Sequence, residues 1–205
     1  MKIVGQMALS FFPMWKECLI SLRDKVDELY LRFDLLNGNK NIINEIISIT
    51  DNKLKHLLLS NSEWNNSTMI WREEMFRLLD TVKPDIVVMA DHDEVFQETL
   101  NSEIAEFFKS DKLGMMLDYF EPMPTIDHVP IPKYPPRPHM KVIKWKPDLS
   151  YIPYLSRLRI YPNEKDWWNA KTKIIHYSHY TKELREKKII DIKKRESDHK
   201  KFRRI

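Results

Sequence analysis

Glycine is scarce in this chain, with only three among 205 residues, at Gly5, Gly38 and Gly114. Phosphate-binding loops of the P-loop and dinucleotide-fold kinds need several closely spaced glycines, because their backbone must approach the phosphate. The sequence therefore excludes a glycine-rich phosphate cradle. Any phosphate has to be held by a metal ion or by cationic side chains.

Cysteine and long apolar runs are also lacking. The single cysteine, Cys18, cannot form a disulfide within the chain, and its helical context suggests a small buried apolar side chain. No window approaches the roughly 18 apolar residues of a membrane-spanning helix, and the N-terminus lacks the order of a signal peptide. We expect a soluble, cytoplasmic protein.

Charge is distributed unevenly along the chain. The whole sequence has a net charge of +4, but residues 182–205 contain 11 Lys/Arg and 5 Asp/Glu, which leaves −2 for residues 1–181. The length favours one domain, which we place at 1–181. The basic tail at 182–205 could meet nucleic acid, an anionic membrane surface or only solvent.

Strand-like and helix-like patterns alternate through the first 90 residues. Strands are predicted at 2–7, 28–33, 55–59 and 86–90, and helices at 12–26, 41–50 and 64–81. This alternation is typical of an α/β fold in which helices cover a mostly parallel sheet. A helix at 99–108 and a strand at 113–120 continue the pattern.

The texture changes after residue 120, because ten of the twelve prolines lie between Pro122 and Pro162. Proline at this density excludes a regular helix. The interleaved aromatic residues favour an ordered, irregular region with short strands at 140–145 and 155–160. A last strand is predicted at 173–177 and a charged helix at 182–190.

Residues 86–94, Ile-Val-Val-Met-Ala-Asp-His-Asp-Glu, are the most informative stretch, because an apolar strand leads into three carboxylates. In an extended segment Asp91 and Asp93 would face the same way at the strand's carboxyl end, where open α/β sheets bind ligands. Carboxylates favour Mg²⁺ or Mn²⁺, which commonly take one or two of them and leave other positions to water and phosphate. The alternative is a helix N-terminus that carries acidic residues.

In this layout the chain resembles a small GT-A fold glycosyltransferase, closest to the family 2 nucleotide-sugar transferases. Residues 2–34 resemble the opening strand, helix and second strand, whose terminal acid, here Asp34, contacts the nucleotide base. Residues 71–77 and 83–94 resemble the helix and strand that deliver the Asp-x-Asp metal motif. Residues 175–178 resemble a late His-Tyr-Ser element whose histidine returns to the metal or diphosphate.

The resemblance implies a GT-A-like fold, a nucleotide-sugar donor and Mn²⁺ or Mg²⁺. Asp93 would bind the metal, Asp91 would act through a metal-bound water or the ribose, and His176 would be a third ligand of the metal or diphosphate. Arg72 is a candidate substrate contact, although ordinary pairing on a helix surface explains it as well. Residues 1–95 would form the nucleotide-binding half and residues 96–181 the acceptor side.

An inverting transferase needs a general base near the acceptor hydroxyl, typically a carboxylate. Asp118 and Glu121, at the end of the strand predicted at 113–120, are the candidates for this catalytic role. Trp145, Trp167 and Trp168 could stack on a sugar or a base, although such rings more often belong to a core.

Three functions remain open from the sequence. The first is a metal-dependent glycosyltransferase, whose acceptor could be modified nucleic acid, as in bacteriophage DNA modification, or a glycan or lipid-linked molecule. The second is a phosphotransferase or nuclease that uses the same acids with two ions about 4 Å apart. The third is a non-catalytic, basic nucleic-acid-binding protein dominated by its tail.

Overall fold

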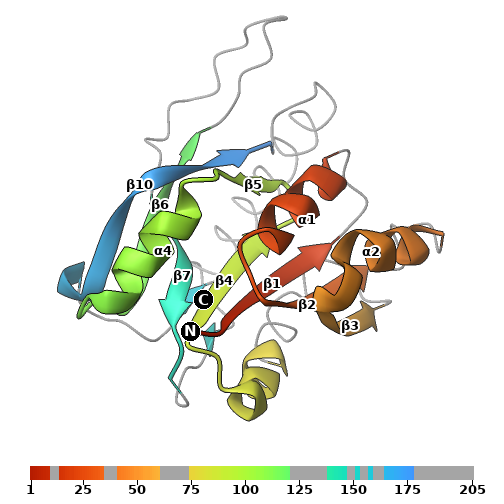
Figure 1. Cartoon of the computed structure of the whole chain (residues 1–205), viewed down its shortest axis with the longest axis horizontal. Helices are drawn as coiled ribbons and strands as arrows, with labels where there is room; N and C mark the ends of the chain where they lie inside the picture. The colour runs from red at the N-terminus through yellow and green to blue at the C-terminus, as the bar shows by residue number, and fades with distance from the viewer. Residues whose placement is uncertain are drawn as a thin grey trace, which may run out of the picture.

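An eight-stranded mixed sheet organises the chain in the computed structural model, which describes residues 1–9, 14–34, 41–60, 74–120, 138–146, 151–152, 157–158 and 164–177. The strands are β1 (Ile3–Leu9), β2 (Glu28–Asp34), β3 (Leu54–Ser60), β4 (Ile86–Asp91), β5 (Glu94–Phe96), β6 (Gly114–Phe120), β7 (His139–Lys144) and β10 (Trp167–His176). Their order is β3-β2-β1-β4-β7-β6-β10-β5 (Figure 1). A separate two-stranded ladder joins β8 (Tyr151–Ile152) to β9 (Arg157–Leu158).

The first half of the sheet confirms the pattern predicted from the sequence. Strands β3, β2, β1 and β4 are adjacent and all parallel. The helices α1 (Trp15–Arg23) and α2 (Ile42–Thr50) lie between them in the chain, as the alternation predicts. Because these strands are parallel, the carboxyl ends of β1, β2 and β4 meet at one edge of the sheet, and Asp34 and Asp91 both lie at that edge.

The second half of the sheet is mixed. Strand β7 runs antiparallel to both β4 and β6, β10 is parallel to β6, and β5 is antiparallel to β10. The strand predicted at 173–177 begins earlier, at Trp167. Of the strand predicted at 155–160, the structure describes Arg157–Leu158, which form β9. The three-residue β5 was not predicted, because a segment so short carries no readable period.

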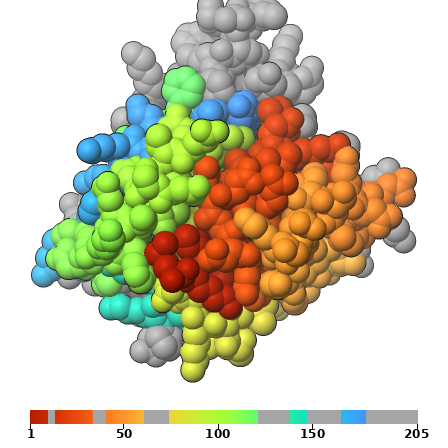
Figure 2. All heavy atoms as spheres, viewed as in Figure 1, coloured from red at the N-terminus to blue at the C-terminus, as the bar shows by residue number. Residues whose placement is uncertain are grey.

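Helices cover both faces of the sheet and bury a core on each. On one face, α1, α2 and α4 (Leu100–Lys109) pack over the larger core, and Figure 2 shows these red, orange and green segments adjoining across that face. Helix α1 buries Trp15, Cys18, Leu19 and Leu22, the spacing of a single helical stripe. On the other face, the helix at residues 74–82 buries Met75 against the smaller core.

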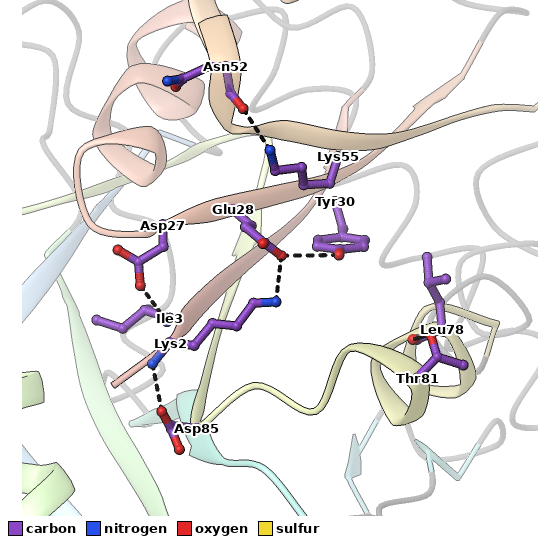
Figure 3. A network of polar contacts seen from close by, with 10 residues as sticks. All are labelled: Lys2, Ile3, Asp27, Glu28, Tyr30, Asn52, Lys55, Leu78, Thr81 and Asp85. Carbon is purple, nitrogen blue, oxygen red and sulfur yellow. Dashed lines mark hydrogen bonds and ion pairs between the residues drawn. The ribbon is translucent and has the colours of Figure 1, made fainter.

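Polar contacts close the amino edge of the parallel strands, opposite the edge with the acidic residues (Figure 3). The Lys2 backbone amide donates to Asp85 Oδ2 at 2.6 Å, and the Ile3 amide donates to Asp27 Oδ2 at 2.7 Å. The Lys2 ammonium pairs with Glu28 Oε2 at 3.1 Å. Asp85 and Asp27 therefore accept backbone amides at the start of the first strand, and Glu28 pairs with the Lys2 side chain, so these contacts stabilise the amino edge of the sheet.

A buried glutamate on α4 supports an irregularity in β10. The register between β10 and β6 shifts between Asn169 and Lys173, so the intervening amides leave the regular ladder. The Glu103 carboxylate accepts from the Lys171 amide at 2.5 Å and from the Thr172 amide at 2.8 Å. Glu103 thus accepts hydrogen bonds from backbone amides that the shift would otherwise leave buried without a partner.

Several predicted features lie outside the described residues. They are the first part of the helix predicted at 64–81, the proline-rich segment at 121–137, the charged helix at 182–190 and the basic tail. In the described part of the chain, no helix has both the length and the apolar character needed to cross a membrane.

Candidate functional site

The acidic residues occupy the turn between β4 and β5. Asp91 is the last residue of β4, His92 and Asp93 form a turn, and Glu94 begins β5. The prediction that Asp91 and Asp93 face the same way along one extended segment is therefore wrong. The chain must bend here because β5 pairs with β10 at the edge of the sheet rather than continuing β4.

A buried lysine meets two of the three acids. The Lys141 ammonium on β7 lies 2.6 Å from Glu94 Oε1 and 2.9 Å from Asp91 Oδ2. The Glu94 side chain is fully buried and that of Lys141 is 6% exposed, whereas Asp91 is 26% exposed. The second Glu94 oxygen accepts the Asp91 backbone amide at 3.0 Å. Glu94 therefore holds both the lysine and the end of β4.

Tyr119 links this buried group to two histidines. Its hydroxyl donates a short hydrogen bond to Glu94. Its ring stacks on His139 with centroids 4.2 Å apart and on His176 with centroids 4.5 Å apart, at interplanar angles of 11° and 20°. The stack restricts the orientation of the His176 imidazole, because an aromatic plane lies against its face.

Asp93 faces His176 rather than the lysine. The Nε2 atom of His176 lies 3.3 Å from Asp93 Oδ2, and the Tyr177 amide donates to the Asp93 carbonyl at 2.8 Å. Burial alone raises the pKa of Asp93, but the hydrogen bond and charge of His176, together with the charge of His92, lower it by more. The net pKa of Asp93 lies below its ordinary value, which favours the carboxylate.

The other ionisable groups of the cluster shift in the opposite direction. Burial raises the pKa of Glu94 even though the Lys141 ammonium opposes the shift. Burial also raises the pKa of Tyr119, so its hydroxyl stays protonated and donates to Glu94. Burial raises the pKa of the nearby Cys18 thiol, and the charges of Asp93 and Glu94 add to it, so this cysteine stays an inert core residue.

The structure brings together only some of the residues predicted for the site. Asp93 and His176 are in contact, and Asp91 ends β4 at the same carboxyl edge. Asp34 ends β2 at this edge, although its side chain lies outside the described residues. Asp118 is exposed, one residue before Tyr119 on β6, so the two side chains point to opposite faces. Arg72 and Glu121 fall outside the described residues.

Sequence reasoning missed Lys141, Tyr119 and His139. One signal was available for Lys141, because it lies between Met140 and Val142 on β7, and a lysine buried among apolar residues needs a carboxylate partner. Nothing in the sequence identified which carboxylate that would be, because β7 reaches β4 only after the proline-rich segment.

The fit of a divalent ion can be judged from these contacts. Among the residues that the structure describes, no three His, Cys, Asp or Glu side chains are arranged so that they could jointly hold a metal ion. Asp93 and His176 are two adjacent donors, with side chains 16% and 12% exposed. Mg²⁺ and Mn²⁺ are commonly bound through one or two carboxylates plus water and phosphate. Asp93 could supply the carboxylate of such a site, with the His176 imidazole as the adjacent donor.

Solved structures show partial similarity to this chain at low sequence identity. No protein-family model matches it, and no curated protein matches it. Among solved structures, it is similar to TarS 1-349 from S. aureus, with 14% identity, a TM-score of 0.46, and coverage of 65% of this chain and 39% of that one. It also resembles 4-diphosphocytidyl-2C-methyl-D-erythritol synthase from Anaerococcus prevotii, with 13% identity, a TM-score of 0.44 and 70% coverage of each chain.

A third similar structure is HddC from Yersinia pseudotuberculosis, with 13% identity, a TM-score of 0.42, and coverage of 86% of this chain and 93% of that one. Likeness of this degree carries no residue role or substrate to this chain. The observed sheet and its flanking helices agree with the GT-A-like fold that the sequence resemblance implies.

Proposed function

We propose that this protein is a metal-dependent glycosyltransferase that moves a sugar from a nucleotide-diphosphate sugar to an acceptor hydroxyl. The observation that carries the proposal is the Asp93–His176 pair, which lies at the carboxyl edge of the sheet beside the end of β4. Open α/β sheets bind ligands outside the carboxyl ends of their strands.

Glycosyl transfer needs charge compensation on the departing diphosphate, and a bound divalent ion supplies it as a Lewis acid and template. Asp93 and His176 would hold this ion. Asp34, at the end of β2, would approach the nucleotide. Glu121 would accept the proton of the acceptor hydroxyl as the general base. Asp118 is the weaker candidate, because its side chain points to the face of β6 opposite Tyr119, and mutation of each in turn separates the two.

The phosphotransferase or nuclease reading is weaker. A two-ion site needs carboxylates that reach both ions, about 4 Å apart. Glu94 has no exposed surface and is engaged by Lys141 and Tyr119, so it is withdrawn from such a role. Cleavage of phosphodiesters without turnover of nucleotide sugars would nevertheless overturn the glycosyltransferase proposal.

The proposal is tested by ligand-dependent stability. The melting temperature is measured with a panel of nucleoside diphosphates, with and without Mn²⁺, on the wild type and on Asp93→Asn. We expect one nucleotide to stabilise the wild type only with Mn²⁺, by about 2.7 kcal/mol at a hundredfold excess over Kd, and the variant to lose this effect. No response to any nucleotide would favour a non-catalytic protein.

The acceptor is the next question. A net charge of +6 on residues 182–205 suits a large anionic acceptor, and modified nucleic acid is the candidate. Labelled sugar should pass to hydroxymethylated DNA, and removal of the tail should weaken the DNA interaction most at low salt. Equal transfer after removal of the tail would exclude any role for it, and transfer to a glycan instead would change the acceptor class.

A further inference from the structure

The ammonium of Lys141 pairs with Asp91, a carboxylate close in sequence to the proposed metal ligand Asp93. It is 2.9 Å from Asp91 Oδ2, and Asp91 stands two residues before Asp93. A lysine ammonium and a divalent cation seek the same carboxylate oxygens and repel each other. While Lys141 holds Asp91, this carboxylate is less available to an ion that binds at Asp93 and His176.

A second, buried carboxylate holds the lysine in place, so its ammonium stays beside Asp91 in the folded protein. Glu94 binds the ammonium at 2.6 Å from a fully buried position. Glu94 is in turn held by the Tyr119 hydroxyl and by the Asp91 amide. The Lys141 side chain is 6% exposed, and withdrawing it would leave the buried Glu94 carboxylate without its cation.

We propose that Lys141 is a positioning residue that withholds Asp91 from the metal, so that the ion binds weakly until a nucleotide diphosphate supplies the missing ligands. The inference rests on the proposed function and adds an order of binding to it, because tight binding of the ion then requires the nucleotide-sugar donor. It also accounts for the absence of a three-ligand set among the described residues of the site.

The test measures the binding of Mn²⁺ alone, by the loss of the free-ion signal in electron paramagnetic resonance. Lys141→Met removes the ammonium and keeps an unbranched apolar side chain that matches the alkyl part of lysine. Without the Lys141 ammonium, Asp91 can coordinate the ion, and we expect about 10- to 100-fold tighter Mn²⁺ binding. Lys144→Met is the matched control, because Lys144 lies on the same strand and bonds the Ser110 carbonyl instead. It should bind Mn²⁺ as the wild type does.

A double-mutant cycle identifies the released ligand. Asp91→Asn should change Mn²⁺ binding little in the wild-type background, and it should remove the whole gain in the Lys141→Met background. If Lys141→Met does not fold, Lys141→Met with Glu94→Gln removes the buried pair together and should show the same gain. Mn²⁺ binding that is no tighter in a folded Lys141 variant overturns the inference.

Failure of this inference differs from failure of the proposed function. The wild type is titrated with Mn²⁺ in the presence of each nucleoside diphosphate, and Asp93→Asn is titrated in parallel. If a nucleotide promotes Mn²⁺ binding that depends on Asp93, while Lys141→Met shows no gain, only the role of Lys141 is wrong. If no form binds Mn²⁺ with or without nucleotide, both proposals fall.

Discussion

The Nε2 atom of His176 lies 3.3 Å from Oδ2 of Asp93, and this contact joins the turn after β4 to the end of β10. Strand β5 positions the two residues, because its antiparallel pairing with β10 places Glu94 opposite His176. A backbone hydrogen bond from the Tyr177 amide to the Asp93 carbonyl also holds this turn against β10. Two donors from distant parts of the sequence are thus presented together.

Replacement of Asp93 by asparagine should abolish most turnover of a nucleotide sugar. The amide keeps the shape of the side chain but removes the charge that would hold a divalent ion, so we expect a loss in kcat/KM of at least about 100-fold. Asp111→Asn, at an aspartate whose side chain is 86% exposed, is the control and should keep wild-type activity. Unchanged turnover in Asp93→Asn would contradict the proposed metal site.

Replacement of Lys141 by methionine should destabilise the fold, because it leaves the buried Glu94 carboxylate without its cation. Removing one partner of a buried ion pair costs about 3–5 kcal/mol. Burial already raises the folded pKa of Glu94 above its ordinary 4.5. A carboxyl with a raised folded pKa costs stability as the pH rises above its unfolded value, so the deficit of the variant should grow from pH 4 to pH 7. Chemical denaturation at both values measures it, and a deficit independent of pH would contradict this explanation.

The sequence predicted the parallel half of the fold well, because each strand and helix there is specified by local periodicity. The strand at 86–90 and its acids followed from residues adjacent in the chain. The cluster around Lys141 did not, because β7 joins β4 across a segment whose prolines hide any period. The contact between Asp93 and His176 could be suggested only through family resemblance, because no local pattern relates β5 to β10.

Replacement of Glu103 by glutamine should destabilise the protein near neutral pH. The two carboxylate oxygens of Glu103 accept one amide each, from Lys171 and from Thr172. The NH₂ group of glutamine cannot accept a hydrogen bond, so we expect the free energy of unfolding to fall by about 1–3 kcal/mol. Glu106→Gln, at an exposed position on the same helix, is the control. The comparison uses unfolding in urea.

The stabilisation by Glu103 should also depend on pH. Burial raises the pKa of this carboxyl, but the hydrogen bonds from Thr172 and Lys171 outweigh it, and the folded pKa lies below the ordinary 4.5. The stabilisation is therefore fully present above about pH 4.5 and is lost as the pH falls through the folded pKa. The difference between wild type and Glu103→Gln should shrink on acidification. A difference that grows toward low pH would show that the carboxylate is not the stabilising form.

Gly5 lies on β1 under the end of α1 and the residues that follow it. A Cβ added at this position would lie 3.1 Å from side-chain atoms of Leu22, Val26 and Leu29 at once. Leu22 and Leu29 are fully buried and Val26 is 4% exposed, so the surrounding core has little room to move. The absence of a side chain at Gly5 therefore allows the helix to sit against β1.

Replacement of Gly5 by alanine should lower the free energy of unfolding by about 1–3 kcal/mol, because three buried side chains must shift together. Gly114→Ala is the matched comparison, since its Cβ would meet only the flexible end of Met140, at 2.8 Å from Cε and 3.0 Å from Sδ. Methionine readjusts easily, so this variant should lose less stability despite the shorter contact. Urea denaturation of both variants measures the difference. A larger loss in Gly114→Ala would mean that the contact distance, rather than the rigidity of the neighbours, sets the cost.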